Sequence, residues 1–435
     1  MDVSAIVILV GLLVPFMLTG LPIAYCMGAC SIVYMLYTEG LFFNYQIVAQ
    51  RMMYGINNFT LIAVPFFIFA AQLMNTGGIT RRLYNFANML VGHWPGGLGQ
   101  VNIIGSVIFA GMSGAAVSDA AGLGKIEIEA MVNAGYEVDF AAAVTAASST
   151  IGPIIPPSIP LVLYGVSAQT SVGALLLGGI VPGLIMAACM MLMVQYYAKK
   201  RNYPREPKPT LEGALKATVE ALPVLVTPVI LIGGISWGWF TPTEASVVAA
   251  AYAFVLSVFI YRELPLKDVP QVLMETMEQA APIALICAAA SIYGWLMLRS
   301  GVPMAAAELI PHLAQTQLGT LFVIIIFLLF VGMFMEPVSA ILILTPILVP
   351  YVQSIGIDLV HFGMVMVLTL MIGLLTPPVG MVLYVLTTVA DISFDRVVKA
   401  TLPFLIPLLA ALAIITIWPG VVTFVPRITM GWGVY

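Results

Sequence analysis

Two proline-containing segments in apolar surroundings carry the residues that could bind an ion or a ligand. They read GPIIPPS at residues 152–158 and GLLTPPV at residues 373–379, so that corresponding residues are 221 positions apart. Proline removes a helical hydrogen bond, and inside a bilayer an unpartnered N–H or C=O group is costly unless it lines an enclosed cavity. Carbonyl oxygens of an interrupted helix can replace the water around a cation, and the N-terminus of a half-helix attracts an anion. We therefore expect two interrupted helices that bind ions and a charged solute.

The frame of 221 residues extends beyond these prolines and indicates an internal repeat. It pairs Gly111 with Gly332, Gly135 with Gly356, Gly152 with Gly373, Pro182 with Pro403, and Pro156 and Pro157 with Pro377 and Pro378. Matched leucines arise easily by chance in an apolar chain, whereas matched glycines and prolines do not. Broken helices at matching positions of two halves are typical of transporters.

The composition is that of a membrane protein with many spans. Of 435 residues, 61% are hydrophobic and 8% are charged, whereas soluble domains have roughly 25% charged residues. One crossing needs about 20 apolar residues. We predict ten crossings, near residues 3–18, 21–38, 58–76, 137–170, 172–198, 218–238, 242–261, 277–299, 359–390 and 397–418.

Two further apolar regions, about 98–134 and 318–355, are each too long for one crossing. The first is interrupted by GMSGAAVSDAAGLG and the second by GMFMEPVSA, so we predict that each forms a re-entrant helical hairpin. The segments 39–57 and 79–97 mix aromatic residues with arginine or glutamine, as helices at a membrane surface do. They are either simple connectors or arms that link a moving domain to a fixed scaffold.

The basic residues predict the orientation of the chain, because cytoplasmic loops carry the excess of Lys and Arg. With the N-terminus outside and each hairpin counted as no net crossing, thirteen basic residues lie inside and three lie outside. Five crossings then separate corresponding positions of the two halves. Because this number is odd, the two halves have opposite orientations in the membrane. The predicted fold is all-α and polytopic, with inverted repeats at 1–198 and 218–435 joined by a cytoplasmic linker at 199–217. Each repeat has about five spans, one hairpin and one broken helix, at 137–170 or 359–390.

Three segments together resemble a known family: GMSGAAVSDAAGLG, SSTIGPIIPPSIPLVLYG at 148–165 and GLLTPPVGMVLYV at 373–385. Over essentially its whole length the chain resembles the large, DctM-like membrane subunit of TRAP transporters, the tripartite ATP-independent periplasmic carriers. The resemblance implies a sodium-driven importer of the elevator type, similar to the ion transporter superfamily, in the bacterial inner membrane. It also implies a periplasmic substrate-binding protein and a small four-helix membrane subunit. We expect the small subunit to be a separate chain, because the sequence begins directly with a span.

Residues of the hairpin tips and the breaks are the candidates for binding sodium through hydroxyl and carbonyl oxygens. In the first half they are Ser113, Gly114, Ser148, Ser149, Ile151 and Pro153. In the second half Gly332 of the hairpin faces Gly373, Thr376 and Val379. The family resemblance implies one sodium site in each half. Alternatively, the Ser and Thr side chains serve only in helix packing.

The substrate is expected beside these sites, at Ser113, Asp119, Thr150, Pro156, Pro157, Pro377 and Pro378. Acids inside a membrane are costly, which makes Asp119 and Glu336 functional candidates. Asp119 is equally well placed, with Ser118, to cap a hairpin helix. Glu244 in FTPTEAS fits the first turn of a capped helix, and we favour that interpretation.

The remaining charged residues offer little for binding an anion. Arg299 is expected to reach the outer membrane surface, and Lys125 could pair with Glu129 four residues on. The three histidines, His93, His312 and His361, suggest no metal site. No motif for ATP or peptide hydrolysis occurs, so we expect neither an enzyme nor any cofactor besides sodium, and no nucleic-acid partner.

The predicted function is sodium-driven import of a small organic acid, such as a C4-dicarboxylate, a keto acid or a sugar acid. Substrate and sodium would bind between hairpin tips and broken helices, in a domain that moves against a scaffold. The alternative is a stand-alone sodium/carboxylate symporter, which shares paired hairpins and inverted repeats and needs no binding protein.

Overall fold

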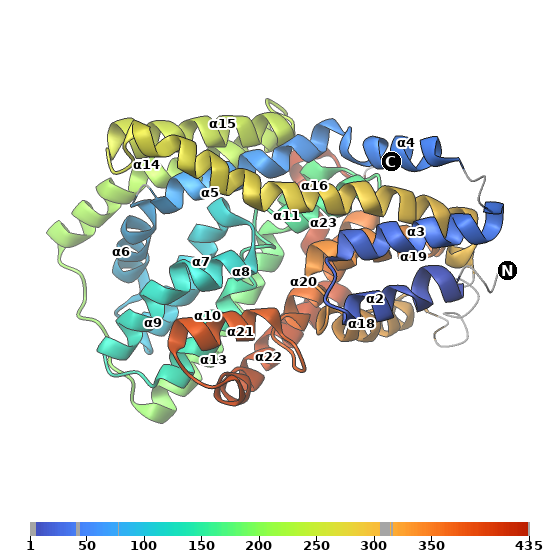
Figure 1. Ribbon diagram of the computed structural model, residues 1–435. Coiled ribbons are helices and arrows are strands. Elements are labelled where there is room, and N and C mark those ends of the chain that lie inside the picture. The colour runs from blue at the N-terminus through green and yellow to red at the C-terminus, as the bar shows by residue number, and fades with distance from the viewer. Residues whose placement is uncertain (1–5, 41–43, 77, 305–313, 315, 434–435) are drawn as a thin grey trace.

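The computed structural model describes residues 6–40, 44–76, 78–304, 314 and 316–433, without the side chains of residues 6 and 111–113. All regular elements in these ranges are helical, which confirms the predicted all-α class (Figure 1). In the first half the helices are α2 (Leu13–Leu18), α3 (Ile23–Glu39), α4 (Tyr45–Ile56), α5 (Ala63–Thr76), α6 (Ile79–Val91), α7 (Gly97–Ser113), α8 (Ala116–Ala121), α9 (Leu123–Asn133), α10 (Val138–Ser149), α11 (Ile159–Ser167), α12 (Val172–Gly178) and α13 (Ile180–Arg201).

In the second half they are α14 (Leu211–Ser236), α15 (Pro242–Val255), α16 (Val269–Arg299), α18 (Gln317–Gly332), α19 (Pro337–Ser354), α20 (Leu359–Gly373), α21 (Met381–Ala390), α22 (Phe394–Ile417) and α23 (Pro419–Met430). Short 3-10 or π segments are η1 (Ile6–Gly11), η3 (Phe59–Ile62), η4 (Leu256–Ile260) and η5 (Leu266–Asp268).

Seven helical segments in the described part of the chain are long and apolar enough to cross a membrane. Six of them coincide with predicted crossings, and the seventh is α19, which was predicted as one leg of a hairpin. The predicted crossings at 137–170 and 359–390 are absent from this set because each is divided, into α10 and α11 and into α20 and α21. Those at 3–18 and 21–38 correspond to the shorter apolar helical segment Val7–Leu18 and to the 17-residue α3.

The helices form two layers (Figure 1). Along one side run α3, α4, α5, α14, α15 and α16, and the 31-residue α16 contacts α3, α4, α5 and α19. The other side holds the hairpins and the divided helices. We define the first hairpin as α7 to α9 and the second as α18 and α19. Each half of the sequence therefore contributes to both layers.

The connection between the halves is shorter than predicted. Residues 202–210 have no regular structure, whereas the predicted linker covered 199–217. Helix α14 begins at Leu211 because the Thr210 side chain accepts a hydrogen bond from Gly213 N at 3.2 Å and caps it. The outer limits of the two repeats remain predictions.

The two amphipathic segments predicted at the membrane surface are helices α4 and α6. No residue of α4 is buried, whereas Ile79, Leu83, Ala87 and Val91 give α6 one buried face at helical spacing. Helix α6 contacts both α7 of the first hairpin and α14 of the other layer. This placement joins the two layers, as the arm interpretation requires.

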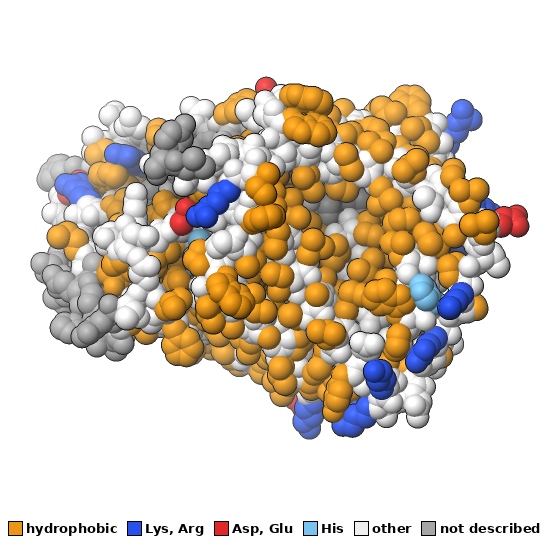
Figure 2. Space-filling view, turned by 180° about the vertical axis from the view of Figure 1, so that it is seen from behind, with side chains coloured by type: hydrophobic (Ala, Val, Ile, Leu, Met, Phe, Trp, Pro, Cys, Tyr) orange, Lys and Arg blue, Asp and Glu red, His pale blue; other side chains and the backbone are white. Residues whose placement is uncertain are grey.

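Apolar side chains cover the middle of the surface in Figure 2, and most Lys and Arg side chains lie at its margins. Large apolar side chains are exposed over the molecule as a whole. Examples are Leu18 at 82%, Val229 at 63%, Ile406 at 65% and Phe330 at 60%. An apolar surface of this extent is unfavourable in water, and it suits contact with lipid or with other membrane helices.

Candidate functional site

The first break, residues 150–158, separates α10 from α11 and is buried throughout. Its Pro156–Pro157 peptide bond is cis. Ser158 caps α11 by accepting a hydrogen bond from Leu161 N at 3.2 Å, and its own hydroxyl donates to the Pro153 carbonyl. The freed backbone groups are thus partly satisfied within the break, as burial in a membrane protein demands.

The second break, residues 374–380, separates α20 from α21 in the same way. Its Pro377–Pro378 bond is also cis, and Gly380, at φ +59°, precedes α21. The Gly380 N–H donates to the Met333 carbonyl at 3.3 Å, which ties this break to the second hairpin. The Thr376 hydroxyl donates to the Ile372 carbonyl at 3.0 Å.

Each hairpin tip meets one break at a glycine. In the second half a Cβ atom placed on Gly373 would lie 2.6 Å from Gly332 Cα, so the two backbones are in direct contact. In the first half a Cβ on Gly114 would lie 2.7 Å from the Pro157 carbonyl oxygen. The structure therefore brings together Gly332 with Gly373 and Gly114 with the first break, as the sequence repeat suggested. The side chain of Ser113 lies outside the described part of the structure.

A buried amide that the sequence analysis missed connects the first hairpin to α10, the helix that leads into the first break. Asn102 of α7 donates to the Thr145 hydroxyl at 2.7 Å and accepts from the Ser148 hydroxyl at 2.6 Å. All three residues are buried. The sequence does show an asparagine inside an apolar leg of the hairpin. Because buried polar groups require hydrogen-bond partners, this residue could have been predicted to bond to a neighbouring helix.

The other hydroxyls of the first break bond within their own helix. Ser149 donates to the Ala146 carbonyl at 2.9 Å and Thr150 to the Ala147 carbonyl at 2.6 Å. A hydroxyl that donates its hydrogen keeps its oxygen lone pairs, which can still face a cation. The Ile151 carbonyl accepts from the N–H groups of Ile154 and Ile155. The two hydroxyl oxygens fit a sodium ion by ligand type, whereas these two hydrogen bonds already use both lone pairs of the Ile151 carbonyl oxygen.

The two candidate acids of the hairpins differ in their surroundings: Asp119 is buried, whereas Glu336 is half-buried. Glu336 caps α19 by accepting from Ser339 N at 3.1 Å. Asp119 is 2% exposed but is not a cap, because α8 begins after Ala115 without a side-chain cap. Its carboxylate lies against Gly152 of the first break, where an added Cβ would collide with Oδ2. The capping alternative for Asp119 is therefore wrong, and its position beside the break is retained as a candidate.

The structure also decides three assignments of exposed charges. Thr241 and Glu244 form a reciprocal capping box at the start of α15, which confirms the cap interpretation of Glu244. Arg299 pairs with Glu39 at 3.3 Å and lies over the Trp295 ring. Among the described residues no ion pair joins Lys125 to Glu129, so that predicted pair is absent.

A cavity of about 510 Å³ lies between the two hairpin tips. Residues 114–117 and 334–339 line it from the tips, and Pro153 and Leu374 line it from the breaks. The rest of its wall comes from α16, through Pro282, Ile283 and Ile286, and from α2, α3 and the helices that flank the breaks, through Met17, Ile23, Ile159, Pro160, Met371 and Met381. Among the described residues of this lining, Glu336 alone is ionisable. Thr150, Pro156, Pro157, Pro377, Pro378 and Asp119 do not line the cavity, although all were predicted near the substrate.

Replacing Asn102 by alanine is expected to destabilise the protein by about 1–3 kcal/mol, because two buried hydroxyls lose a partner. Thermal unfolding in detergent and sodium-free buffer measures the effect. Ser149→Ala is the matched control, since its hydroxyl bonds only to its own helix. Equal melting temperatures for the two variants would show that Asn102 does not hold the hairpin to α10.

An all-helical membrane fold with two hairpin tips and two interrupted helices around one cavity defines a membrane permease of the transporter class. The chain belongs to the family described as "Tripartite ATP-independent periplasmic transporter, DctM component", whose model matches residues 10–421. It is thus a TRAP transporter large permease and a multi-pass protein of the bacterial inner membrane.

Relatives cover nearly the whole chain. The sialic acid TRAP transporter large permease protein SiaM of Vibrio cholerae is 44% identical over 95% of this chain and 96% of its own. The C4-dicarboxylate TRAP transporter large permease protein DctM of Rhodobacter capsulatus is 37% identical over 98% and 99%. The crystal structure of the YdaH transporter of Alcanivorax borkumensis shares the fold with a TM-score of 0.65, at 13% identity, over 91% of this chain and 90% of that one.

Proposed function

We propose that this chain is the large membrane subunit of a sodium-driven tripartite importer, which carries a small organic acid into the cytoplasm by an elevator movement. One observation carries the proposal: the cavity touches both hairpin tips, both breaks and α16 at once. A solute there contacts the layer of hairpins and the layer of long helices together. Movement of one layer against the other would expose it to alternate sides.

The charge of the cavity supports coupling to a cation. Glu336 is the one ionisable group in the described part of its lining, so no basic residue there offsets the charge of an organic acid. An anion without such a partner is costly where water is scarce. Sodium ions held by oxygen atoms at the breaks would offset this cost, so substrate and sodium would bind together.

The residues of the two breaks are proposed to hold these ions. Gly114, Ser148, Ser149, Ile151 and Pro153 would contribute in the first half. Gly332, Gly373, Thr376 and Val379 would contribute in the second. The contacts of Gly114 with Pro157 and of Gly332 with Gly373 support this grouping, because they place each hairpin tip on its break.

The proposed substrate is a sugar acid, keto acid or C4-dicarboxylate. The relatives named for sialic acid and C4-dicarboxylates are both carriers of organic acids by their names. A volume of about 510 Å³ lies within the range of pockets that enclose small molecules. The family's tripartite character supports two partners, a small membrane subunit and a periplasmic binding protein.

Reconstitution with one component omitted at a time tests this proposal. We expect uptake of a labelled organic acid only when vesicles contain the small subunit and this chain, with loaded binding protein outside. Undiminished uptake of free substrate without the binding protein would instead support the stand-alone symporter.

A further inference from the structure

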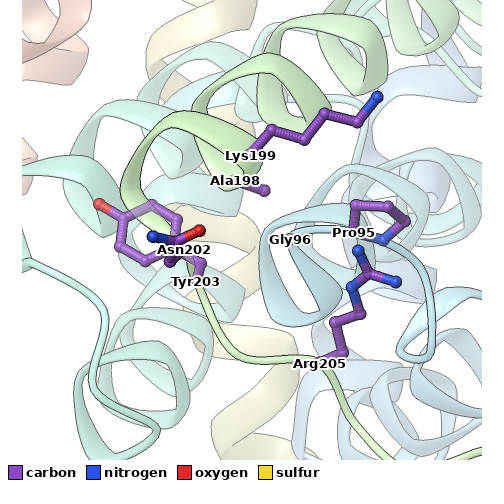
Figure 3. Close-up of a pocket in the computed structure, with 7 residues that line it drawn as sticks. All are labelled: Pro95, Gly96, Ala198, Lys199, Asn202, Tyr203 and Arg205. Atoms are coloured by element: carbon purple, nitrogen blue, oxygen red, sulfur yellow. The ribbon is translucent and has the colours of Figure 1, made fainter.

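A second cavity, of about 270 Å³, lies at the end of α7 that is opposite to the hairpin tip. Here α13 ends and the connection between the halves begins. Figure 3 shows Pro95, Gly96 and Arg205 on one side of it, Asn202 and Tyr203 on the opposite side, and Ala198 and Lys199 above. Lys199 extends above Pro95 in this view, and the guanidinium of Arg205 reaches up beside it. Two cationic side chains from separate turns of the chain therefore border one hollow.

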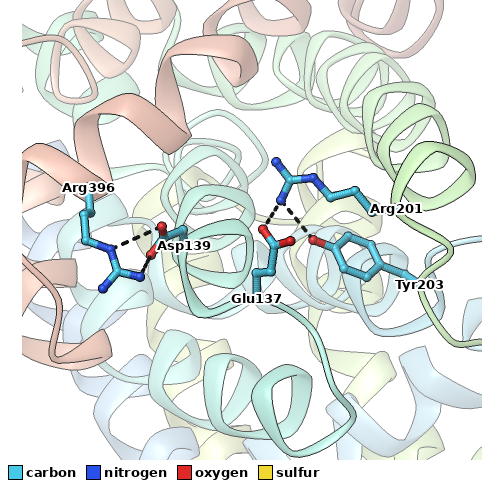
Figure 4. Close-up of polar contacts among 5 residues, drawn as sticks. All are labelled: Glu137, Asp139, Arg201, Tyr203 and Arg396. Atoms are coloured by element: carbon cyan, nitrogen blue, oxygen red, sulfur yellow. Dashed lines mark hydrogen bonds and ion pairs between the residues drawn. The ribbon is translucent and has the colours of Figure 1, made fainter.

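Two of the neighbouring acids, Glu137 and Asp139, are paired with other arginines, and Glu206, which follows Arg205, is outside the lining. Arg201, between the two cations in sequence, pairs with Glu137 and donates to the Tyr203 hydroxyl at 3.2 Å (Figure 4). Asp139, at the start of α10, pairs with Arg396 at 2.7 Å. Neither Lys199 nor Arg205 takes part in an ion pair among the described residues. The described lining holds no acidic residue, so its formal charge is +2.

The walls of the cavity are held in place by the fold. Tyr203 is 9% exposed and stacks on Tyr136, with ring centroids 4.5 Å apart. Tyr136 in turn donates to the Pro204 carbonyl at 3.0 Å, and burial raises the pKa of Tyr136 to about 12, so this donor stays protonated. Glu206 N donates to the Gly92 carbonyl at 3.0 Å and fixes the chain beyond Arg205. The two cations thus project from an ordered segment.

The position of the cavity indicates what kind of anion it meets. Lys199 and Arg201 end the candidate span Val172–Arg201, so the cavity lies where a bilayer changes from hydrocarbon to headgroups. The density of basic residues from 199 to 216 places this end on the cytoplasmic side. Basic pockets between membrane helices on that side suit anionic phospholipid headgroups.

We propose that Lys199 and Arg205 bind a phosphate-bearing anion in this cavity, the headgroup of an anionic phospholipid of the inner leaflet. Helix α7 adds to the attraction, because its N-terminal end begins at Gly97 beside the cavity without an acidic residue in its first turn. The bound headgroup would join the end of α13 to the loop between α6 and α7. It would thereby couple the connection between the halves to the base of the first hairpin.

The test compares lipid retention by the purified full-length chain, measured by native mass spectrometry, with added phosphatidylglycerol, phosphatidylcholine or inorganic phosphate. The double variant Lys199→Gln and Arg205→Gln should retain about fivefold less phosphatidylglycerol than the unaltered protein, since it loses two charge-assisted contacts. The double variant Lys208→Gln and Lys216→Gln removes the same charge from exposed positions outside the cavity and should retain it fully.

Phosphatidylcholine should bind weakly to every form. Displacement of phosphatidylglycerol by millimolar phosphate would support an anion site at Lys199 and Arg205, and it would show that the site binds free phosphate as well as lipid. Equal retention by both double variants would overturn the proposal. If the first double variant does not fold, as judged by its melting temperature, the single variants Lys199→Gln and Arg205→Gln provide the same comparison, each with an intermediate loss expected.

Discussion

Gly373→Ala is expected to reduce sodium-dependent uptake about tenfold or more in vesicles that contain the complete transporter. The new Cβ would lie 2.6 Å from Gly332 Cα and 2.7 Å from its carbonyl carbon, and both are backbone atoms that cannot rotate away. Overpacking of this kind costs about 1–3 kcal/mol, and about 1.4 kcal/mol changes an equilibrium tenfold. The second hairpin would be forced off its break, and the proposed second sodium site would open.

Gly28→Ala is the matched control for this variant. Gly28 also lies in a helix, α3, but an added Cβ would meet no atom within 4 Å. Alanine is favoured over glycine in a helix by roughly 0.5–1 kcal/mol, so uptake should equal that of the unaltered protein. Full uptake by Gly373→Ala, at equal expression, would contradict the role of the hairpin contact.

Gly114→Ala is expected to have an effect of similar size in the first half, with a weaker apparent affinity for sodium. The backbone at Gly114 has φ +63°, and a Cβ there would lie 2.7 Å from the Pro157 carbonyl oxygen. Alanine therefore meets two penalties, one from the left-handed backbone, roughly 1–2 kcal/mol, and one from the collision with the first break. Uptake measured against sodium concentration separates affinity from maximal rate.

Gly238→Ala separates the two penalties. Gly238 has φ +69°, and an added Cβ would meet no atom within 4 Å. It should show the backbone penalty as a lower melting temperature while its dependence on sodium stays unchanged. If Gly238→Ala and Gly114→Ala shift the sodium dependence equally, the contact between Gly114 and Pro157 has no part in ion binding.

Much of this architecture could be predicted from the sequence because lipid limits the choices. Apolar length and the duplicated prolines predicted the divided helices. The grouping of Gly332 with Gly373 was also predicted, and the structure brings their backbones into contact. In the first half the repeat pairs Gly332 with Gly111, whereas the tip residue that meets the break is Gly114. The place of Glu244 in the first turn of a capped helix could be predicted because a capping box is a local pattern of four residues.

Contacts between distant segments could not be predicted in the same way. Asn102 reaches Thr145 and Ser148 across 43 and 46 residues, and nothing in their spacing states that α7 and α10 are neighbours. The wall that Pro282, Ile283 and Ile286 give the cavity depends likewise on where α16 crosses the hairpins. Asp119 looked like a cap in sequence, but α8 begins at Ala116, so the carboxylate falls beyond the cap position and turns toward Gly152.

The most direct test of the account is uptake driven by an imposed ion gradient. Vesicles containing this chain and the small subunit are given loaded binding protein outside, with an inward gradient of sodium, potassium or protons. The account predicts that labelled organic acid accumulates inside only with the sodium gradient and stops when the gradient is collapsed. Equal accumulation with potassium, or with the proton gradient alone, would contradict sodium coupling at the two breaks.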